Sequence, residues 1–419
     1  MKKVYVDITQ LYNWRGKVTG IQRVMYEISS RFRGDESFDP VFVMWDKGTA
    51  SFYGVDFDQI EEFLKESQTS STQSGWAQRR ARYVALFKRV YRHVPLSRTM
   101  YNVYSSLRSK AIRLRSSSGT ITIEPNTMLF MPHGGVWESQ TYITEILRLR
   151  KTNGVKLVPI LFDMCPVISP QFVVEPVQEA FENYMKQILP KSDLVLAISE
   201  NTARDAKKWL ASIGLADPKN IKVFRLGDEI GRGSAKPVKV PSEFIVCVGT
   251  VEARKNHTGL YYAYKLAAER GESLPPVVIA GRKGWMSGDV YQLMTNDPEI
   301  RDKFIFIHNG TDDELAWLYQ NALFSVYPSF YEGWGLPIAE SLLRGTPCVA
   351  SGTSSMKEIG GDLVSYFSPF SSDQIKDKIS AYYDDRALLK SIRKRISKEY
   401  KTTTWDMSYA EVAKEIKKL

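Results

Sequence analysis

Residues 325–351 read SVYPSFYEGWGLPIAESLLRGTPCVAS, and the interpretation of the whole chain starts from this stretch. The pattern predicts a strand, a loop with two glycines, a helix, a tight turn and a second strand. Pro337 suits the first turn of the helix, where a missing N–H costs nothing. Glu332 lies in the loop and Glu340 lies about one turn into the helix. These carboxylates, the loop amides and the helix N-terminus are expected to face one spot, which can hold an anion beside hydroxyl groups.

Length and composition restrict the class of protein. A chain of 419 residues predicts two or more domains, and 43% apolar residues exclude wholesale disorder. The three cysteines show neither disulfide nor zinc spacing, which indicates a reducing cytoplasm and no metal site. Asp7 comes too early for a signal peptide, and no apolar run approaches about 18 residues. We therefore expect a soluble or peripheral protein in the cytoplasm.

Strands and helices alternate along both halves of the chain, which predicts an α/β fold with two parallel sheets. The strand at 4–9, a loop with a glycine and the helix at 20–33 are typical of the start of a nucleotide-binding domain. A Gly- and Pro-containing stretch at 231–241 marks the predicted domain boundary. The predicted domains are residues 1–235 and 236–400, followed by a C-terminal helix at 401–419.

The net charge of +10 comes from one stretch of the chain. Residues 67–123 contain no acidic side chain and eleven lysines and arginines, and without them the chain would carry about −1 (10 − 11). This stretch predicts an insertion at about 68–119, with amphipathic helices inside 76–115. It could be a solvated insertion, a nucleic-acid patch or a membrane-surface helix. Aromatic and aliphatic residues share one face, which favours an anionic membrane surface and disfavours nucleic acid.

Four motifs of the second half resemble the nucleotide-sugar domain of the retaining glycosyltransferases of family 4. In chain order they are GTVEARKNH (249–257), HNGTDDELAWLYQNA (308–322), YEGWGLPIAESLLRGTPCVAS (331–351) and SSMKEIGGD (354–362). The first half is similar to that family more weakly, through TGIQR (19–23), LFDMCPVISP (161–170) and AISENTARDA (197–206). The resemblance implies the GT-B fold of two facing Rossmann-like domains, in which the first is on the acceptor side and the second binds the nucleotide sugar. The C-terminal helix is expected to cross back onto the first domain.

The resemblance also implies roles for the residues of the opening stretch. Glu332 is expected to bind hydroxyls of the donor sugar, and Glu340 the ribose diol, because a carboxylate accepts two hydroxyl hydrogen bonds well. The backbone of the loop is expected to hold sugar and phosphate, through Gly333, Trp334, Gly335 and Leu336. The alternative is that the two carboxylates are a loop cap and a surface helix residue. The glycines and the proline between them favour the functional interpretation.

Arg254 and Lys255 follow a predicted strand, at the end where open α/β sheets bind their ligands. They could be a solvated basic turn, but the resemblance makes them a clamp on the donor diphosphate that stabilises the leaving phosphate. No paired-aspartate metal motif is present, and a cationic clamp removes the need for one. By resemblance the donor is also contacted by Gly20 and Arg23 from the first domain, and by Gly249, Asn309 and Leu315.

Two residues of the first half are candidates for contact with the reacting sugar. Asp163 ends an apolar strand, at a place where many relatives carry a His-Asp pair, although Phe162 replaces the histidine here. His133, in the run MPHGGVW, is the other candidate; a buried structural histidine is the alternative. Ser199 is expected to cap the helix that follows it.

The resemblance implies a retaining, metal-independent hexosyltransferase without a cofactor, which takes its sugar from a nucleoside diphosphate. We expect GDP-mannose as donor, with dTDP-rhamnose and UDP-sugars as alternatives. The expected acceptor is a lipid-linked or surface-polysaccharide glycan, at the inner face of the plasma membrane. Three other classes of protein are possible. One is a sugar-nucleotide epimerase, although the acid and base residues that it needs are not visible in the sequence. The others are a non-catalytic glycan- or membrane-binding GT-B protein and a nucleic-acid binder, which a salt-dependent shift assay would expose.

Deleting residues 68–115 should abolish binding to anionic liposomes and leave a folded protein, because the basic excess lies in this stretch. Co-sedimentation with vesicles measures the binding, and circular dichroism measures the fold. Unchanged binding after the deletion would refute the membrane interpretation.

Overall fold

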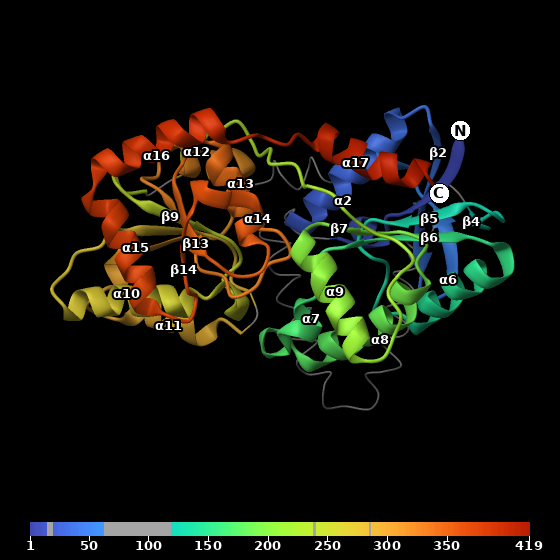
Figure 1. The fold of residues 1–419 in the computed structure, drawn as a ribbon, viewed down its shortest axis with the longest axis horizontal. Coiled ribbons are helices and arrows are strands. Elements are labelled where there is room, and N and C mark those ends of the chain that lie inside the picture. Colours follow the sequence, from blue (N-terminus) through green and yellow to red (C-terminus); the bar gives the residue numbers. More distant parts are fainter. Residues whose placement is uncertain (15–19, 63–118, 238–239, 285) are drawn as a thin grey trace, which may run out of the picture. The chain divides into compact units, whose positions relative to one another are not determined.

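The computed structural model describes residues 1–14, 20–62, 119–237, 240–284 and 286–419, which form two compact units (Figure 1). The first unit is Met1–Pro159 with Lys191–Asp193, and the second is Ile160–Pro190 with Leu194–Leu419. The domain boundary expected at residues 235–236 stays a prediction. The amphipathic helices expected within 76–115 lie outside the described residues.

The first unit is built on a mixed sheet in the order β4-β3-β2-β1-β5-β6. Its strands are β1 (Lys2–Asp7), β2 (Phe38–Asp46), β3 (Ser51–Gly54), β4 (Thr120–Ile121), β5 (Met128–Met131) and β6 (Lys156–Leu161). Its helices are α1 (Thr9–Asn13), α2 (Gly20–Arg31), η1 (Phe32–Gly34) and α6 (Gln140–Asn153). Strands β1, β2, β5 and β6 pair in parallel as predicted, whereas β3 pairs antiparallel with β2 and with β4. The short turn after β2 leaves room only for a hairpin, because a parallel return needs a long crossover.

The second unit begins inside β6, which pairs in parallel with β7 (Val195–Ala197), and β7 pairs in parallel with β8 (Ile221–Val223). The helices here are α7 (Cys165–Ile168), η2 (Pro170–Phe172), α8 (Glu175–Ile188) and α9 (Glu200–Ser212), and η3 (Leu189–Lys191) follows α8. The Ser199 hydroxyl accepts the N–H of Thr202, which confirms the predicted cap of α9.

A second sheet is parallel throughout, in the order β11-β10-β9-β12-β13-β14. Its strands are β9 (Ile245–Val248), β10 (Val277–Ala280), β11 (Phe304–Ile307), β12 (Ser325–Tyr327), β13 (Cys348–Ser351) and β14 (Ser365–Phe367). The elements around it are η4 (Ala253–Lys255), α10 (His257–Glu269), α11 (Gly288–Asn296), η5 (Arg301–Lys303), α12 (Asp312–Asn321), α13 (Leu336–Leu343), α14 (Met356–Gly360), η6 (Gly361–Leu363), α15 (Ser372–Asp384) and α16 (Arg386–Glu399). The strands are almost wholly apolar because helices cover both faces.

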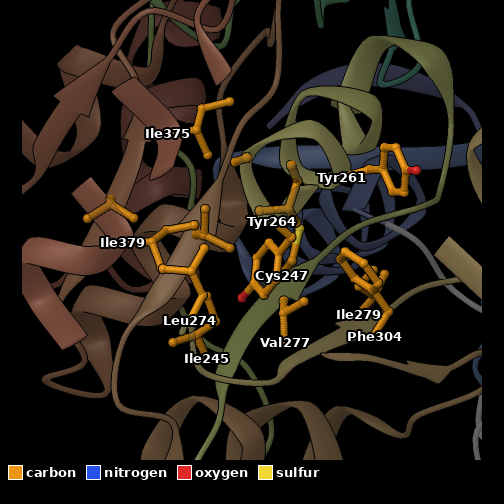
Figure 2. Packing of buried hydrophobic residues seen from close by; sticks show 14 of the residues in the cluster. Ile245, Cys247, Tyr261, Tyr264, Leu274, Val277, Ile279, Phe304, Ile375 and Ile379 are labelled. Atoms are coloured by element: carbon orange, nitrogen blue, oxygen red, sulfur yellow. The ribbon is translucent and has the colours of Figure 1, made fainter. Parts of the chain in front are cut away.

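Alternate residues of one strand supply two cores, one on each face of this sheet. Ile245 and Cys247 of β9 pack with residues of α10, α11 and α15 (Figure 2). Val246, between them, packs on the opposite face with Tyr319 of α12. This burial on both faces fixes the strand ends, and with them the loops that follow at the carboxyl edge of the sheet.

The last helix, α17 (Trp405–Lys417), attaches to the segment that precedes β9. The Trp405 N–H donates to Glu229, and Glu411 accepts the N–H of Arg225. A Cβ atom on Gly227 would lie 2.5 Å from the Trp405 ring, so this close approach requires glycine. Among the described helices, including α17, none is both long and apolar enough to cross a bilayer.

Candidate functional site

Arg254 and Lys255 are held between a strand and a helix at the carboxyl edge of the second sheet. They lie in η4, which follows β9, and Asn256 comes next in the left-handed conformation (φ 55°). Asparagine tolerates this conformation better than most residues. The Asn256 side chain accepts the N–H of Gly259 and so caps α10. The two cationic side chains therefore start from a fixed backbone.

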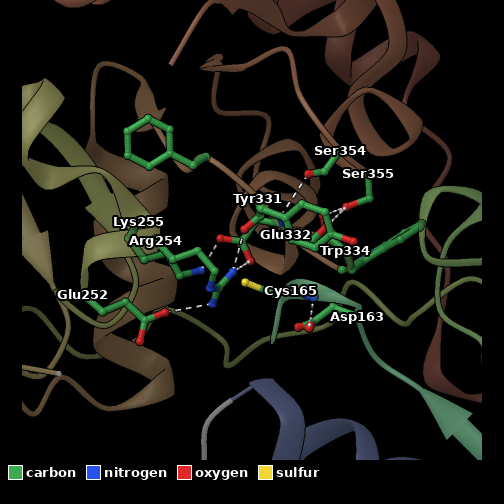
Figure 3. Close-up of polar contacts among 12 residues, drawn as sticks. Asp163, Cys165, Glu252, Arg254, Lys255, Tyr331, Glu332, Trp334, Ser354 and Ser355 are labelled. Carbon is green, nitrogen blue, oxygen red and sulfur yellow. Dashed lines mark hydrogen bonds and ion pairs between the residues drawn. The ribbon is translucent and has the colours of Figure 1, made fainter. Parts of the chain in front are cut away.

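Both cations meet on Glu332, as Figure 3 shows. Glu332 Oε2 lies 2.6 Å from Arg254 Nη1, and Oε1 lies 2.7 Å from Lys255 Nζ. Arg254 also donates to Glu252 at 2.9 Å, and Lys255 donates to the Tyr327 hydroxyl at 2.7 Å. We call these five residues, Glu252, Arg254, Lys255, Tyr327 and Glu332, the charge cluster.

The charge cluster keeps Glu332 ionised although the residue is only 6% exposed. Burial alone raises the pKa of the Glu332 carboxyl, but Arg254 and Lys255 outweigh burial and lower that pKa to about 2. Burial lowers the pKa of Arg254, yet Glu332 and Glu252 hold it well above its ordinary value. Two full positive charges and at least one full negative charge are thus confined to a small volume.

Two serines hold the loop that carries Glu332. The Ser354 hydroxyl oxygen accepts the Glu332 N–H at 2.9 Å. The Ser355 hydroxyl donates to the carbonyls of Glu332, at 2.8 Å, and of Trp334. Both serines belong to the motif SSMKEIGGD, and no role was predicted for them from the sequence. Their position just after β13 was the available signal, since β13 ends at the same sheet edge as β9.

Gly333 lets the loop pack directly against the end of β6. A Cβ atom at this position would lie 1.9 Å from the Phe162 carbonyl oxygen and 2.9 Å from Asp163 Cβ. The structure therefore brings Asp163 beside the charge cluster, where its carboxylate also accepts the N–H of Cys165 at 2.9 Å. Burial raises the pKa of Asp163, and Arg254 acts against that rise. Gly335, with φ 138°, adopts a conformation that favours glycine.

The second predicted carboxylate, Glu340, is buried in α13, where it accepts a hydrogen bond from the Tyr319 hydroxyl at 3.0 Å. Trp334 is also buried, with the Arg225 guanidinium 5.6 Å from its ring centroid. Leu336 is the first residue of α13. Glu332 thus lies in the loop and Glu340 in the helix that follows it, with different partners, so each can bind a different part of a ligand.

The remaining predicted site residues fall into two groups. Gly249, Leu315 and Asn309 belong to the second unit: Gly249 follows β9, Leu315 lies in α12, and Asn309 lies in the exposed turn after β11. The first unit contains Gly20 and Arg23 in α2, and also His133, in the turn after β5. Burial lowers the pKa of His133, and Glu138 acts against that fall. All five residues of the charge cluster belong to the second unit, and none of the predicted residues of the first unit is part of it.

The chemistry of the charge cluster suits an anion flanked by hydroxyl groups. Arg254 and Lys255 can bind an anion, and carboxylates such as Glu332 accept hydrogen bonds from hydroxyls. Within the part of the chain that the structure describes, no group of three or more His, Cys, Asp or Glu side chains could hold a metal ion. Two members of the cluster, Glu252 and Tyr327, were not predicted from the sequence; they are further hydrogen-bond partners of Arg254 and Lys255.

Comparison with known proteins supports the family resemblance and the fold. Residues 234–401 match the family described as Glycosyl transferases group 1. The chain is 25% identical over 400 residues to the O-antigen chain mannosyltransferase B of Escherichia coli, covering 93% of both chains.

The solved structure of sucrose-phosphate synthase from Thermosynechococcus elongatus has a TM-score of 0.62 at 13% identity, over 100% of this chain and 99% of that chain. The Anabaena protein HepE, solved in complex with UDP and glucose, has a TM-score of 0.61 at 14% identity, over 100% of both chains. The predicted GT-B fold is confirmed.

Replacing Glu332 with glutamine should remove a pH-dependent part of the stability. Since the folded-state pKa of about 2 is below the ordinary value of 4.5, the Glu332 charge stabilises the fold above about pH 4.5, and this contribution is lost as the pH falls toward 2. The difference in unfolding free energy between wild type and Glu332→Gln, measured by urea denaturation, should therefore shrink between pH 5 and pH 3.

The control is Asp302→Asn, at a side chain that is 96% exposed, which should match wild type at both pH values. A Glu332→Gln difference that is the same at pH 5 and at pH 3 would show that the two cations do not stabilise the Glu332 charge.

Proposed function

We propose, on the premise that residues 234–401 form a glycosyl transferase group 1 domain, that the chain is a retaining hexosyltransferase. It transfers a hexose from a nucleoside-diphosphate sugar to a hydroxyl of a glycan. The observation that carries this proposal is the pairing of Arg254 and Lys255 on Glu332 at the carboxyl edge of the second sheet. Open parallel sheets bind their ligands at this edge.

Donor binding is an exchange of partners within the charge cluster. The guanidinium of Arg254 presents a planar fork that suits phosphate oxygens, and Lys255 adds a point charge. A diphosphate competes with Glu332 for these cations and carries more negative charge than the carboxylate does. Glu332 oxygens released from the ion pairs then accept hydrogen bonds from the hydroxyls of the donor sugar. The ion pairs thus hold both cations in place before the donor arrives.

The transfer breaks the bond between the sugar C1 and a phosphate oxygen and forms a bond between C1 and the acceptor oxygen on the same face. The proton of the acceptor hydroxyl passes to the leaving phosphate. Arg254 and Lys255 stabilise the negative charge that develops on this phosphate, so no metal cofactor is needed. The front-face route, which needs no carboxylate nucleophile, suits this cluster, because Glu332 then accepts hydrogen bonds from the hydroxyls of the donor sugar.

Mannose is the preferred sugar and GDP-mannose the preferred donor. This preference is supported by the Escherichia coli relative, an O-antigen chain mannosyltransferase that matches this chain over nearly its whole length. Transfer of rhamnose, or of a sugar from UDP, is the alternative. The acceptor is a glycan of the same kind of polymer, carried on a lipid.

The enzyme acts as a peripheral protein at the inner face of the plasma membrane. Support comes from the amino-acid sequence: the basic excess falls between residues 67 and 123, where no acidic residue occurs. Such a stretch attracts anionic lipids, by about 1 kcal/mol for each lysine or arginine near the surface. A lipid-carried acceptor would be presented at the same surface.

Sugar nucleotides should raise the melting temperature of the wild-type chain, because a ligand that binds only the folded state stabilises it. GDP-mannose should give the largest shift in a screen that includes dTDP-rhamnose, UDP-glucose and the free nucleotides. At a hundredfold excess over Kd the stabilisation should be about 2.7 kcal/mol. A shift with UDP-glucose alone would exclude GDP-mannose as donor, and no shift with any donor would contradict the proposed transferase activity.

Lys255→Ala should lose most of the turnover, by about two to three orders of magnitude, because it removes one charge that stabilises the leaving phosphate. Release of nucleoside diphosphate measures the rate, and circular dichroism measures the fold. The matched control is Lys265→Ala on α10, whose lysine pairs with Asp297 and Glu299 instead, and it should keep the wild-type rate. A folded Lys255→Ala variant with wild-type turnover would rule out the clamp.

A further inference from the structure

Three phenylalanine rings contact one another in a row whose middle ring lies beside the charge cluster and whose last ring is exposed to solvent. Phe172 stacks on Phe330 with ring centroids 5.0 Å apart, and Phe330 faces Phe370 at 5.2 Å. Phe330 lies two residues before Glu332, and its N–H donates to the Arg254 carbonyl at 2.9 Å. Phe172 and Phe330 are half-buried, whereas Phe370 is 80% exposed.

The exposed ring is carried on a backbone that the site itself holds in place. The side-chain amide of Asn256, which is buried beside Lys255, donates to the carbonyls of Pro328 at 3.1 Å and Pro369 at 2.8 Å. This one amide joins the loop that carries Phe330 to the loop that carries Phe370. The geometry of the ring row is therefore linked to the backbone of the two cations.

The ring of Phe370 is the part of the row that is most available to a ligand. Phe172 and Phe330 are half-buried and contact each other, whereas Phe370 is exposed, so its aromatic face is accessible. Two serines lie within two residues of it in the chain: Ser368, whose N–H donates to Gln374, and Ser371, whose hydroxyl accepts the Gln374 N–H. A single exposed ring with serines on both sides is a narrow apolar surface with a polar rim.

A pyranose ring matches this surface. One face of many pyranoses presents C–H groups, which the electron-rich face of an aromatic ring attracts, while the hydroxyls point to the rim. A lipid chain would need a wider apolar area, because its binding energy scales with the area it buries. We propose that Phe370 is an acceptor subsite, on which a sugar ring of the glycan acceptor stacks next to the site of transfer. This inference rests on the proposed transferase function.

The test measures transfer from GDP-mannose to an α-linked mannotriose by Phe370→Ala, Phe370→Leu and Phe370→Tyr. Loss of the stack should raise the acceptor KM about two- to tenfold in the Ala and Leu variants and leave the donor KM unchanged. Phe370→Tyr, which keeps the ring face, should have the wild-type acceptor KM. Because the side chain is exposed, all three variants should melt at the wild-type temperature.

Tyr262→Ala, at an aromatic residue of α10 that is 48% exposed, is the matched control and should leave the acceptor KM unchanged. A wild-type acceptor KM in Phe370→Ala would overturn the proposal. So would a wild-type KM in Phe370→Leu, which would indicate a requirement for apolar area rather than for a ring face.

A wild-type chain that transfers from no donor would refute the proposed function instead, and a binding measurement would still test the subsite. Saturation-transfer NMR with mannotriose should then give a signal with wild type that is lost in Phe370→Ala. An equal signal from both proteins would overturn the subsite.

Discussion

The burial of the Glu332 carboxylate between two cations is the constraint on which the rest of the second unit depends. An unpaired charge at 6% exposure would be strongly destabilising, so the chain must bring Arg254 and Lys255 to it from another loop. The loop after β9 and the loop after β12 are joined by these ion pairs. The segment after β13 is tied in by Ser354 and Ser355, which bond the backbone of the Glu332 loop. Three neighbouring strand ends thus converge on one charge.

The same constraint prepares the site for a charged ligand. A cation that is already desolvated and held by a carboxylate needs little reorganisation to bind a phosphate. Glu252 and Tyr327 also bond Arg254 and Lys255, so each cation keeps one partner when a phosphate replaces Glu332. Gly333 adds Asp163 to this environment, because only a residue without a side chain fits against the Phe162 carbonyl. The site therefore combines two fixed cations with carboxylates that can accept hydrogen bonds from hydroxyl groups.

The features of the fold and of the site that depend on a local pattern or on one specific motif could be predicted from the amino-acid sequence. The parallel strands of the second unit followed from apolar runs between helical patterns, and the loop position of Glu332 from its glycines and Pro337. The antiparallel strand β3 was missed because a strand of four residues after a turn has little periodicity of its own. Glu252 and Tyr327 were missed for a different reason: nothing local distinguishes a residue that supports Arg254 or Lys255, since that role exists only after the loops have come together.

A crystal structure of the wild-type chain with GDP bound would test directly whether the charge cluster is the donor site. The diphosphate should lie within hydrogen-bonding distance of both Arg254 and Lys255, with at least one of their ion pairs to Glu332 opened. A diphosphate bound elsewhere, with both ion pairs to Glu332 intact, would show that the charge cluster is not the donor site.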